Sequence, residues 1–314
     1  MKKISVITPC FNEEASIIEC VEEVRKVFER DLPNYELEHI FCDNCSTDQT
    51  VPILKQLAVK DQRIKIIVNS RNFGILKNTY NGVLSASGDA AILFMPVDLQ
   101  DPPELIPEFV KKWEEGYEIV YGMRAKREEG FFIRNARKAY YRLLSRLTYV
   151  DYPADAGDFQ LVDRVVLNSL KRIDDARPFM RLMTFDCGFR SYGISYTWRA
   201  RKNGTSRNSF MSMLGQGLNG IVSFSGAPLR SALIFGMVLS SLSILYAFCI
   251  GIMVMTGYLP TGGRGVPTMI VALFFFGGVQ LFFVGVLGEY ILAIYNQVRR
   301  KPLVIERERV NFDS

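Results

Sequence analysis

Along residues 4–123, short apolar runs alternate with segments in which apolar residues recur at helical spacing. Residues 4–8 (ISVIT) form a near-continuous apolar run rich in β-branched side chains, which is typical of a strand buried on both faces. Further strands are predicted at 37–42, 64–68, 90–95 and 117–123. Helices are predicted at 13–28, 50–57, 76–86 and 103–114. This alternation predicts a mostly parallel, Rossmann-like α/β sheet, whose ligands bind beyond the carboxyl ends of its strands.

Two long runs in the C-terminal part carry no charged residue. They cover residues 231–256 and 265–288, and each is long enough to span a hydrocarbon core of ~30 Å, which takes about 20 apolar residues. Both lie too far from the N-terminus to be a signal peptide. The alternative is a pair of buried core helices. The sequence favours a membrane hairpin joined by residues 257–263.

Basic residues flank this hairpin. Those that precede the first run are Arg199, Arg201, Lys202, Arg207 and Arg230. Residues 299–301 (RRK) follow the second run, whereas the connecting loop holds only Arg264. Because an excess of Lys and Arg marks the cytoplasmic side, we predict a protein of the inner or plasma membrane with two spans, a cytoplasmic soluble part and cytoplasmic termini. The net charge of +5 suits an anionic leaflet, and the place of the basic residues beside the spans argues against nucleic acid.

Two further segments combine polar and large apolar residues as amphipathic helices do. Residues 131–149 mix arginines and a lysine with aromatic side chains, and residues 209–224 carry apolar residues just before the first span. Helices of this kind lie in the interface of a membrane. We expect both segments to lie on the bilayer surface.

Polar residues cluster where three of the predicted strands end. The segments are 9–14 (PCFNEE), 43–48 (DNCSTD) and 96–101 (PVDLQD). A single polar strand end would be ordinary, since Asp and Asn also cap helices. Three such ends at one edge of a parallel sheet favour a nucleotide pocket.

Within these segments, Asp98 lies where a buried strand emerges, which is where a metal-binding carboxylate is needed. A hard divalent cation held by oxygen ligands can neutralise a diphosphate. Gln100 offers a second oxygen on the same face of an extended segment. Asp43 can accept hydrogen bonds from a base or a ribose, and its alternative role is that of a turn-forming residue.

The six cysteines add no further site. Cys42 and Cys45 form a lone C-x-x-C, without a second pair or a nearby His that would complete a zinc site. We interpret the cysteines as reduced, structural residues.

Several segments together resemble a known family. They are VITPCFNEE, DNCSTDQT, NSRNFG, MPVDLQDPPE, GDFQL and NGTSR. They are similar to family 2 glycosyltransferases of the GT-A fold. More narrowly, the chain resembles the polyprenyl-phosphate glycosyltransferases, which include dolichyl-phosphate mannose synthases and bacterial bactoprenol glucosyltransferases of the GtrB type. The match runs from Lys3 to about Arg230, and the two C-terminal spans fit the GtrB-like branch.

The resemblance implies roles for single residues. The nucleoside pocket would be lined by Pro9, Phe11, Glu13 and Asp43. The metal, Mg²⁺ or Mn²⁺, would be held beside the donor diphosphate by Asp98 and Gln100. Asp158 matches the carboxylate near the acceptor, and with Asp98 it forms the predicted catalytic pair. The basic residues that close over the donor would be Arg201 and Arg207. Those that hold the acceptor phosphate would be Arg124, Arg137 and Arg142, and Lys138 of the same basic segment is an alternative.

The chain departs from the family pattern in two places. Many relatives carry Asp-x-Asp before the Leu-Gln, whereas Pro96 replaces the first Asp here. One metal ligand is therefore missing or supplied elsewhere, by Asp101 or by the diphosphate itself. Arg207 replaces the usual Lys, which keeps the charge but changes the donor geometry.

The resemblance implies a metal-dependent, inverting enzyme that transfers a sugar from a nucleotide sugar to polyprenyl (undecaprenyl) phosphate at the cytoplasmic membrane face. UDP-glucose is the predicted donor, and GDP-mannose and other UDP-sugars are the alternatives. The acceptor phosphate is already largely an anion at neutral pH, so Asp158 can orient the acceptor or the sugar rather than remove a proton. Residues 1–205 would form the catalytic domain, 206–230 a juxtamembrane helix, 231–295 the hairpin and 296–314 a cytoplasmic tail. A homo-oligomer is compatible with the sequence.

Two other functions stay open at this point. A processive polysaccharide synthase would carry a Gln-x-x-Arg-Trp segment and more spans, whereas here Trp198 precedes Arg199 and two spans are few. A non-catalytic membrane sensor of nucleotide sugars, or an assembly subunit, is supported by Pro96. Asp98, Gln100 and Asp158 argue against it.

Overall fold

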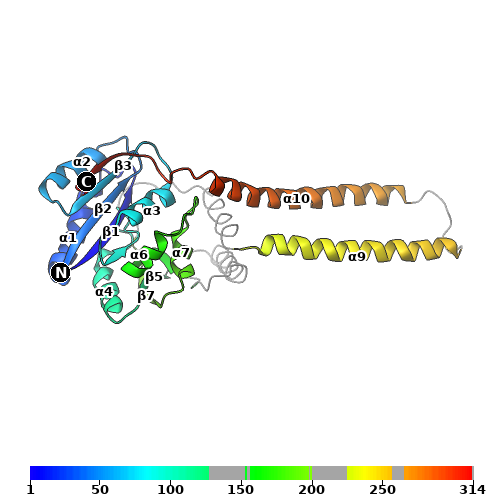
Figure 1. Cartoon of the computed structure of the whole chain (residues 1–314), viewed down its shortest axis with the longest axis horizontal. Helices are drawn as coiled ribbons and strands as arrows, with labels where there is room; N and C mark the ends of the chain where they lie inside the picture. Colours follow the sequence, from blue (N-terminus) through cyan, green and yellow to red (C-terminus); the bar gives the residue numbers. More distant parts are fainter. Residues whose placement is uncertain (127–152, 154–155, 198, 200–224, 257–264, 313–314) are drawn as a thin grey trace. The chain divides into compact units, whose positions relative to one another are not determined.

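The computed structural model describes residues 1–126, 153, 156–197, 199, 225–256 and 265–312. These residues divide into two units. One holds the described chain up to Arg199 and again from Arg300, and the other holds the described residues from Ser225 to Arg299. Figure 1 shows the sheet and short helices of the first unit and the two long helices of the second.

In the described part of the first unit, eight strands form one sheet. They are β1 Lys2–Cys10, β2 Tyr35–Asp43, β3 Ile64–Asn69, β4 Ala90–Ile92, β5 Ile119–Lys126, β6 Ala156–Asp163, β7 Ser191–Thr197 and β8 Glu306–Val310. Their order across the sheet is β7-β5-β6-β4-β1-β2-β3-β8. Neighbouring strands are parallel except at β6, which is antiparallel to β4 and β5, and at β8, which is antiparallel to β3. The amino ends of β6 and β8 therefore lie at the edge where the other strands end.

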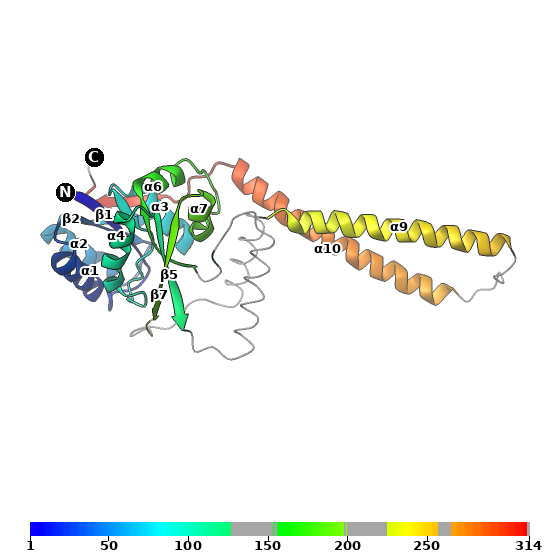
Figure 2. The ribbon, with the colours of Figure 1, turned by 90° about the horizontal axis from the view of Figure 1, so that it is seen from below.

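Helices cover both faces of this sheet (Figure 2). On one face lie α1 Ile17–Asp31, α2 Thr50–Lys60 and α4 Ile106–Glu114, the last preceded by a 3₁₀ turn, Pro103–Leu105. On the other lie α3 Ile75–Ser85, α6 Arg164–Leu170 and α7 Met180–Asp186. The first layer shares a core with the sheet through side chains such as Val24, Phe41, Phe109 and Phe159. Because side chains alternate along a strand, β1 and β2 are buried on both faces, as their sequences predict.

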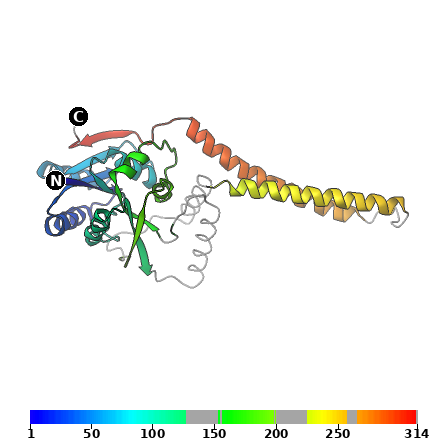
Figure 3. The ribbon, with the colours of Figure 1, turned by 60° about the horizontal axis from the view of Figure 1, so that its bottom comes forward.

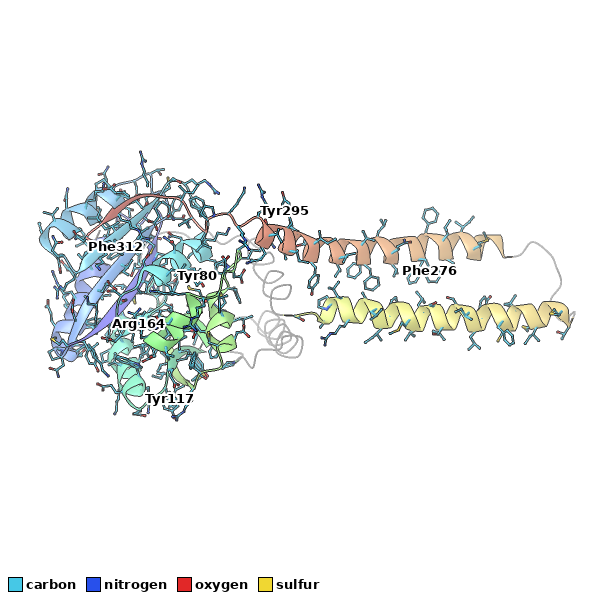
Figure 4. All side chains as sticks on the ribbon, in the orientation of Figure 1. Tyr80, Tyr117, Arg164, Phe276, Tyr295 and Phe312 are labelled. Carbon is cyan, nitrogen blue, oxygen red and sulfur yellow. The ribbon has the colours of Figure 1, made fainter. Side chains whose placement is uncertain are left out.

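The second layer is held close to the sheet by α3. A Cβ atom at Gly82 would lie 2.3 Å from Cys42 Sγ and 2.8 Å from an Ile7 methyl carbon, so this approach requires glycine. The buried hydroxyl of Tyr80, labelled in Figure 4, donates hydrogen bonds to the carbonyls of Leu170 at 2.7 Å and Ile173 at 3.0 Å. These bonds fix α3 to the end of α6.

The predicted mostly parallel α/β sheet is confirmed, and its element boundaries shift. The helix expected at 13–28 begins at Ile17, because the N–H groups of Ser16 and Ile17 donate to the carbonyl of Glu13 and make a turn there. The strand expected at 90–95 ends at Ile92. β6, β7 and β8 were not predicted.

The C-terminal segment, expected to be a tail, contributes β8 to the sheet. This strand, red in Figure 3, lies along β3. Lys55 of α2 pairs with Glu308 at 2.6 Å, and the side-chain amide of Asn311 donates to the carbonyls of Ala58 and Ile64, both at 2.9 Å. Arg309 and Lys65 place cations over the ring of Phe312, at 5.0 and 5.2 Å from its centroid.

The second unit consists of α9 Ala227–Met255 and α10 Val266–Val298. Within them, Ala227–Ile250 and Met269–Val298 are long and apolar enough to cross a membrane, and their most apolar windows are not buried within the structure. Phe276 and Tyr295 project from α10 in Figure 4 and are 43% and 53% exposed. These are therefore not the core helices of a soluble domain, and their apolar surface suits a lipid environment.

Candidate active site at one edge of the sheet

The predicted polar strand ends meet at a single edge of the sheet. Cys10 and Asp43 are paired in register at the ends of β1 and β2, and Asp98 follows β4. Since β6 and β8 run in the opposite direction, their first residues reach the same edge. These strands bring Asp158 and Glu306 to it.

Asn12 ties the loop after β1 to the loop after β2. Its backbone is left-handed, with φ 54°, a conformation that Asn adopts more readily than most residues. Its side-chain oxygen accepts the N–H of Thr47 at 2.7 Å, and its own N–H donates to the hydroxyl of Ser46 at 2.9 Å. The N–H of Glu13 donates to the Thr50 hydroxyl at 2.9 Å. The segment predicted to bind the nucleoside is thus held firmly against its neighbour.

Asp43 is completely buried at the end of β2. Its carboxylate accepts two hydrogen bonds from Ser46, one from the N–H at 2.9 Å and one from the hydroxyl. Burial raises the pKa of Asp43, and the bonds from Ser46 oppose that rise. Asp43 therefore forms a turn with Ser46, and its predicted contact with the nucleoside remains a prediction. Pro9 is buried in β1 and Phe11 half-buried just after it.

A cavity of about 380 Å³ opens beside Asp43. Lys55, Asn69 and Arg307 also line it, and its volume is within the range of small-molecule sites, about 300–1,000 Å³. Arg307 comes from β8, at an irregularity where the register with β3 shifts between Val68 and Asn69. Bulges of this kind re-aim a side chain. The sequence analysis did not place the C-terminal segment at the site.

The segment after β4 forms a tight turn that presents Asp98. Leu99 has φ 54°, and one Asp98 oxygen accepts the N–H of Gln100 at 3.2 Å. The N–H of Arg199 donates to the Gln100 carbonyl at 3.0 Å, and the Gln100 side-chain amide donates to the Arg199 carbonyl at 3.4 Å. The turn is therefore fastened to the chain that follows β7.

Asp98 and Gln100 carry oxygen atoms, the ligands that Mg²⁺ and Mn²⁺ prefer. In the part of the chain that the structure describes, no group of three or more His, Cys, Asp or Glu side chains could hold a metal alone. Mg²⁺ is commonly held by one or two carboxylates together with substrate phosphates. The residues present fit a cation whose shell is completed by a diphosphate.

Asp101 lies in a buried hydrogen-bond network with Arg124 and Tyr196. It is 1% exposed and accepts hydrogen bonds from Arg124 at 3.2 Å to each oxygen, and from the hydroxyl of Tyr196. Arg124 also donates to the Tyr196 hydroxyl at 3.2 Å. Burial raises the pKa of Asp101, whereas Arg124 and Tyr196 lower it. With Asp101 bound in this way, the diphosphate is the better candidate to replace the ligand lost at Pro96.

Asp158, at the start of β6, pairs with Arg181 of α7. The Nε of Arg181 donates to one carboxylate oxygen at 3.0 Å, and an Nη donates to the other. Burial works to raise the pKa of Asp158, but Arg181 and the charge of Arg124 hold it below its usual value. Four charges of alternating sign thus lie together: Asp101, Arg124, Asp158 and Arg181. The sequence analysis missed Arg181 and Tyr196, because no motif or spacing distinguishes them.

Four predicted site residues lie outside the described residues: Arg137, Arg142, Arg201 and Arg207. The same holds for the helices expected at 131–149 and 209–224. Their predicted roles remain predictions.

A doubly covered α/β sheet with carboxylates and amides gathered at the ends of its parallel strands has its polar groups where enzymes of this architecture bind their ligands. The model of glycosyl transferase family 2 matches residues 5–171. The chain belongs to this family, and it is a glycosyltransferase of the hexosyltransferase type.

Relatives match over nearly the whole chain. The "Uncharacterized glycosyltransferase YkcC" of Bacillus subtilis (strain 168) is 36% identical over 99% of this chain and 95% of its own. The bactoprenol glucosyl transferase of Shigella phage SfII is 35% identical over 96% of this chain and 97% of its own. Among solved structures, glucosyl-3-phosphoglycerate synthase from Mycobacterium tuberculosis is 23% identical over 70% of this chain and 76% of its own, with a TM-score of 0.49.

Proposed function

We propose that this enzyme transfers glucose from UDP-glucose to a polyprenyl phosphate, such as undecaprenyl phosphate, at the cytoplasmic face of the membrane. The observation that carries the proposal is the similarity to bactoprenol glucosyl transferases over almost the entire length of both chains. That length includes the two apolar helices α9 and α10, which a soluble acceptor would not require. A lipid acceptor gives the membrane hairpin a purpose.

The donor would bind at the edge of the sheet. Pro9, Phe11, Glu13 and Asp43 are proposed to surround the nucleoside. Asp98 and Gln100 would hold Mg²⁺ or Mn²⁺, which when bound stabilises the negative charge on the departing diphosphate. Arg201 and Arg207 are proposed to add positive charge on the donor side.

The acceptor would bind beside the buried charges. Arg124 is proposed to contact the lipid phosphate together with Arg137 and Arg142, since guanidinium groups bind phosphate oxygens in pairs. A phosphate oxygen attacks the anomeric carbon with inversion, and the bond from that carbon to the diphosphate oxygen breaks, its electron pair leaving with UDP. The acceptor is already an anion at neutral pH, so no proton has to be removed.

The experiment that tests this function uses the full-length protein in detergent or nanodiscs. It is incubated with UDP-glucose, GDP-mannose and other nucleotide sugars, each with undecaprenyl phosphate or with undecaprenol, and the lipids are analysed by mass spectrometry. We expect a glucosyl adduct only with the phosphate and UDP-glucose, and its loss in Asp98→Asn. Mannose transfer from GDP-mannose would establish the alternative donor. Donor binding without transfer to any lipid would favour the sensor.

Topology is tested separately. In a background without the native cysteines, a cysteine at Thr261 should react from outside the cell with an impermeant reagent, and one at Ser314 only after permeabilisation. The opposite pattern would place the nucleotide site on the side that lacks nucleotide sugars, and the proposed function would fail.

A further inference from the structure

Two pairs of side chains join β6 to α7. Asp158 and Gln160 lie two residues apart on β6, and therefore on the same face of the strand. Arg181 and Thr184 lie three residues apart on α7, and therefore on the same face of the helix. Arg181 binds Asp158, and the Thr184 hydroxyl donates to the Gln160 side-chain oxygen at 2.9 Å. The Thr184–Gln160 bond fixes the position of Arg181 relative to Asp158.

The position of Arg181 is determined by packing. Met180, Leu182, Met183 and Phe185 are buried around it, and the ring of Phe185 meets that of Tyr121 of β5 edge-on, with centroids 5.2 Å apart. The side chain of Arg181 itself is 21% exposed. Because these buried residues fix α7, the guanidinium of Arg181 meets Asp158 in one orientation. Little further side-chain entropy is then lost when the substrate binds.

The pairing occupies both oxygens of Asp158. The planar fork of Arg181 takes one lone pair from each oxygen, which leaves the others free to accept hydrogen bonds from a substrate. Two further charged groups act on this carboxylate, Arg124 of β5 and Asp101 after β4, and the hydroxyl of Tyr196 of β7 donates to Asp101. A carboxylate between two guanidinium groups is a weak base, because protonation would cost both attractions.

We propose that Arg181 is a positioning residue that holds Asp158 as a fixed anion, so that Asp158 acts through its charge and not as a proton acceptor. In this role, which rests on the proposed transfer to a lipid phosphate, the negative charge faces the sugar, where positive charge develops as the bond to the diphosphate breaks. The charges balance without a proton: the acceptor phosphate loses one negative charge on forming the ester, and UDP leaves with one more.

The test compares three variants of the full-length enzyme across pH at saturating lipid. Arg181→Gln removes the charge, and Arg181→Lys keeps the charge without the planar guanidinium. Thr184→Val is the matched control, which breaks the Thr184–Gln160 bond and the longer bond from the Thr184 hydroxyl to the Arg181 carbonyl, at 3.3 Å, and leaves both charges in place. We expect Arg181→Gln to lower kcat roughly ten- to hundredfold. Loss of the guanidinium should raise the pKa of Asp158 toward that of the acceptor. The fall in kcat at acidic pH, which in the wild type follows the ionisation of the acceptor near pH ~6, should therefore become steeper.

Arg181→Lys should have the same acidic side of the pH profile of kcat as the wild type, because its ammonium supplies the positive charge. It should recover only part of kcat, because an ammonium binds one oxygen at a time. Thr184→Val should keep the acidic side of the wild-type profile whatever happens to its stability. If the acidic side of the pH profile of kcat were the same in Arg181→Gln as in Thr184→Val, the proposal would be overturned. An equal change in both variants would also overturn it, because it would assign Arg181 a structural role alone.

A second measurement does not depend on transfer. In a double-mutant cycle of melting temperature, Asp158→Asn should remove most of the effect of Arg181→Gln, because each variant breaks the same pair. Additive effects would show that the two groups do not interact and would overturn the proposal. If the wild type failed to glycosylate any lipid phosphate, the proposed function would fail, and the cycle would still decide whether Arg181 holds Asp158.

Discussion

Replacing Arg124 with alanine tests whether this arginine stabilises the fold in addition to its proposed contact with the acceptor phosphate. The change leaves Asp101, which is 1% exposed, without the guanidinium that contacts both of its oxygens. Breaking a buried ion pair by removing one partner costs about 3–5 kcal/mol, because the other charge stays buried. For a domain of this size each kcal/mol lowers the melting temperature by about 2–4 °C, so we expect a loss of about 6–20 °C.

The second half of this experiment uses a double variant. Asp101→Asn in the Arg124→Ala background removes the stranded charge, and Tyr196 can still donate to the amide oxygen. We expect much of the melting temperature to return while transfer to lipid phosphate stays low. Nucleotide affinity, measured by calorimetry on both variants, should be nearly that of the wild type. An Arg124→Ala enzyme that melts like the wild type would refute this reasoning and make Arg124 a ligand only.

Three further predictions concern other parts of the enzyme. Asp98→Asn should abolish transfer and weaken the dependence of nucleotide binding on Mg²⁺. Pro96→Asp should change metal affinity little if the diphosphate completes the metal shell. Titrations of both variants with nucleotide, with and without metal, test these two expectations. Removal of residues 302–314 should lower the melting temperature and weaken UDP binding in calorimetry, because β8 closes the sheet and carries Arg307 to the cavity beside Asp43. Glu38→Gln should destabilise the domain at neutral pH, because bonds from Lys65, Ser5 and Ser87 outweigh burial and lower the pKa of Glu38 to about 2. That pKa lies below its unfolded value, so the gap in melting temperature should close as the pH falls from about 5 towards 2.

The parallel half of the fold is predictable because its sequence signals are local. Strands buried on both faces read as apolar runs, and α1 carries its apolar residues at helical spacing. The polar residues after β1, β2 and β4 were expected at one edge, and the chain direction of parallel strands brings them there. Asp98 and Asp43 could therefore be placed without any knowledge of their contacts.

The antiparallel strands could not be predicted in the same way. β8 contains four charged residues, Glu306–Arg309, and its pattern resembles a solvated tail. It is a strand because the edge of β3 offers unpaired backbone groups, and because Lys55 and Asn81 bind its acidic side chains. Such a strand depends on its neighbours, and neither the apolar period nor a motif reveals it. The same reason hides Arg181, whose only signal is a carboxylate that lies 23 residues away.

The position of β8 changes how the two apolar helices relate to the catalytic domain. Strands β1 to β7 precede α9, and β8 follows α10, so the apolar hairpin is inserted within one sheet-forming domain and is not an anchor added at its end. A chain that ended before the hairpin would leave β3 as an open edge, which is a site for association with other strands. It would also lack Arg307 in the cavity beside Asp43. The sheet is therefore complete only with residues that follow α10, so the strand that carries Arg307 to the cavity beside Asp43 depends on the chain beyond both apolar helices.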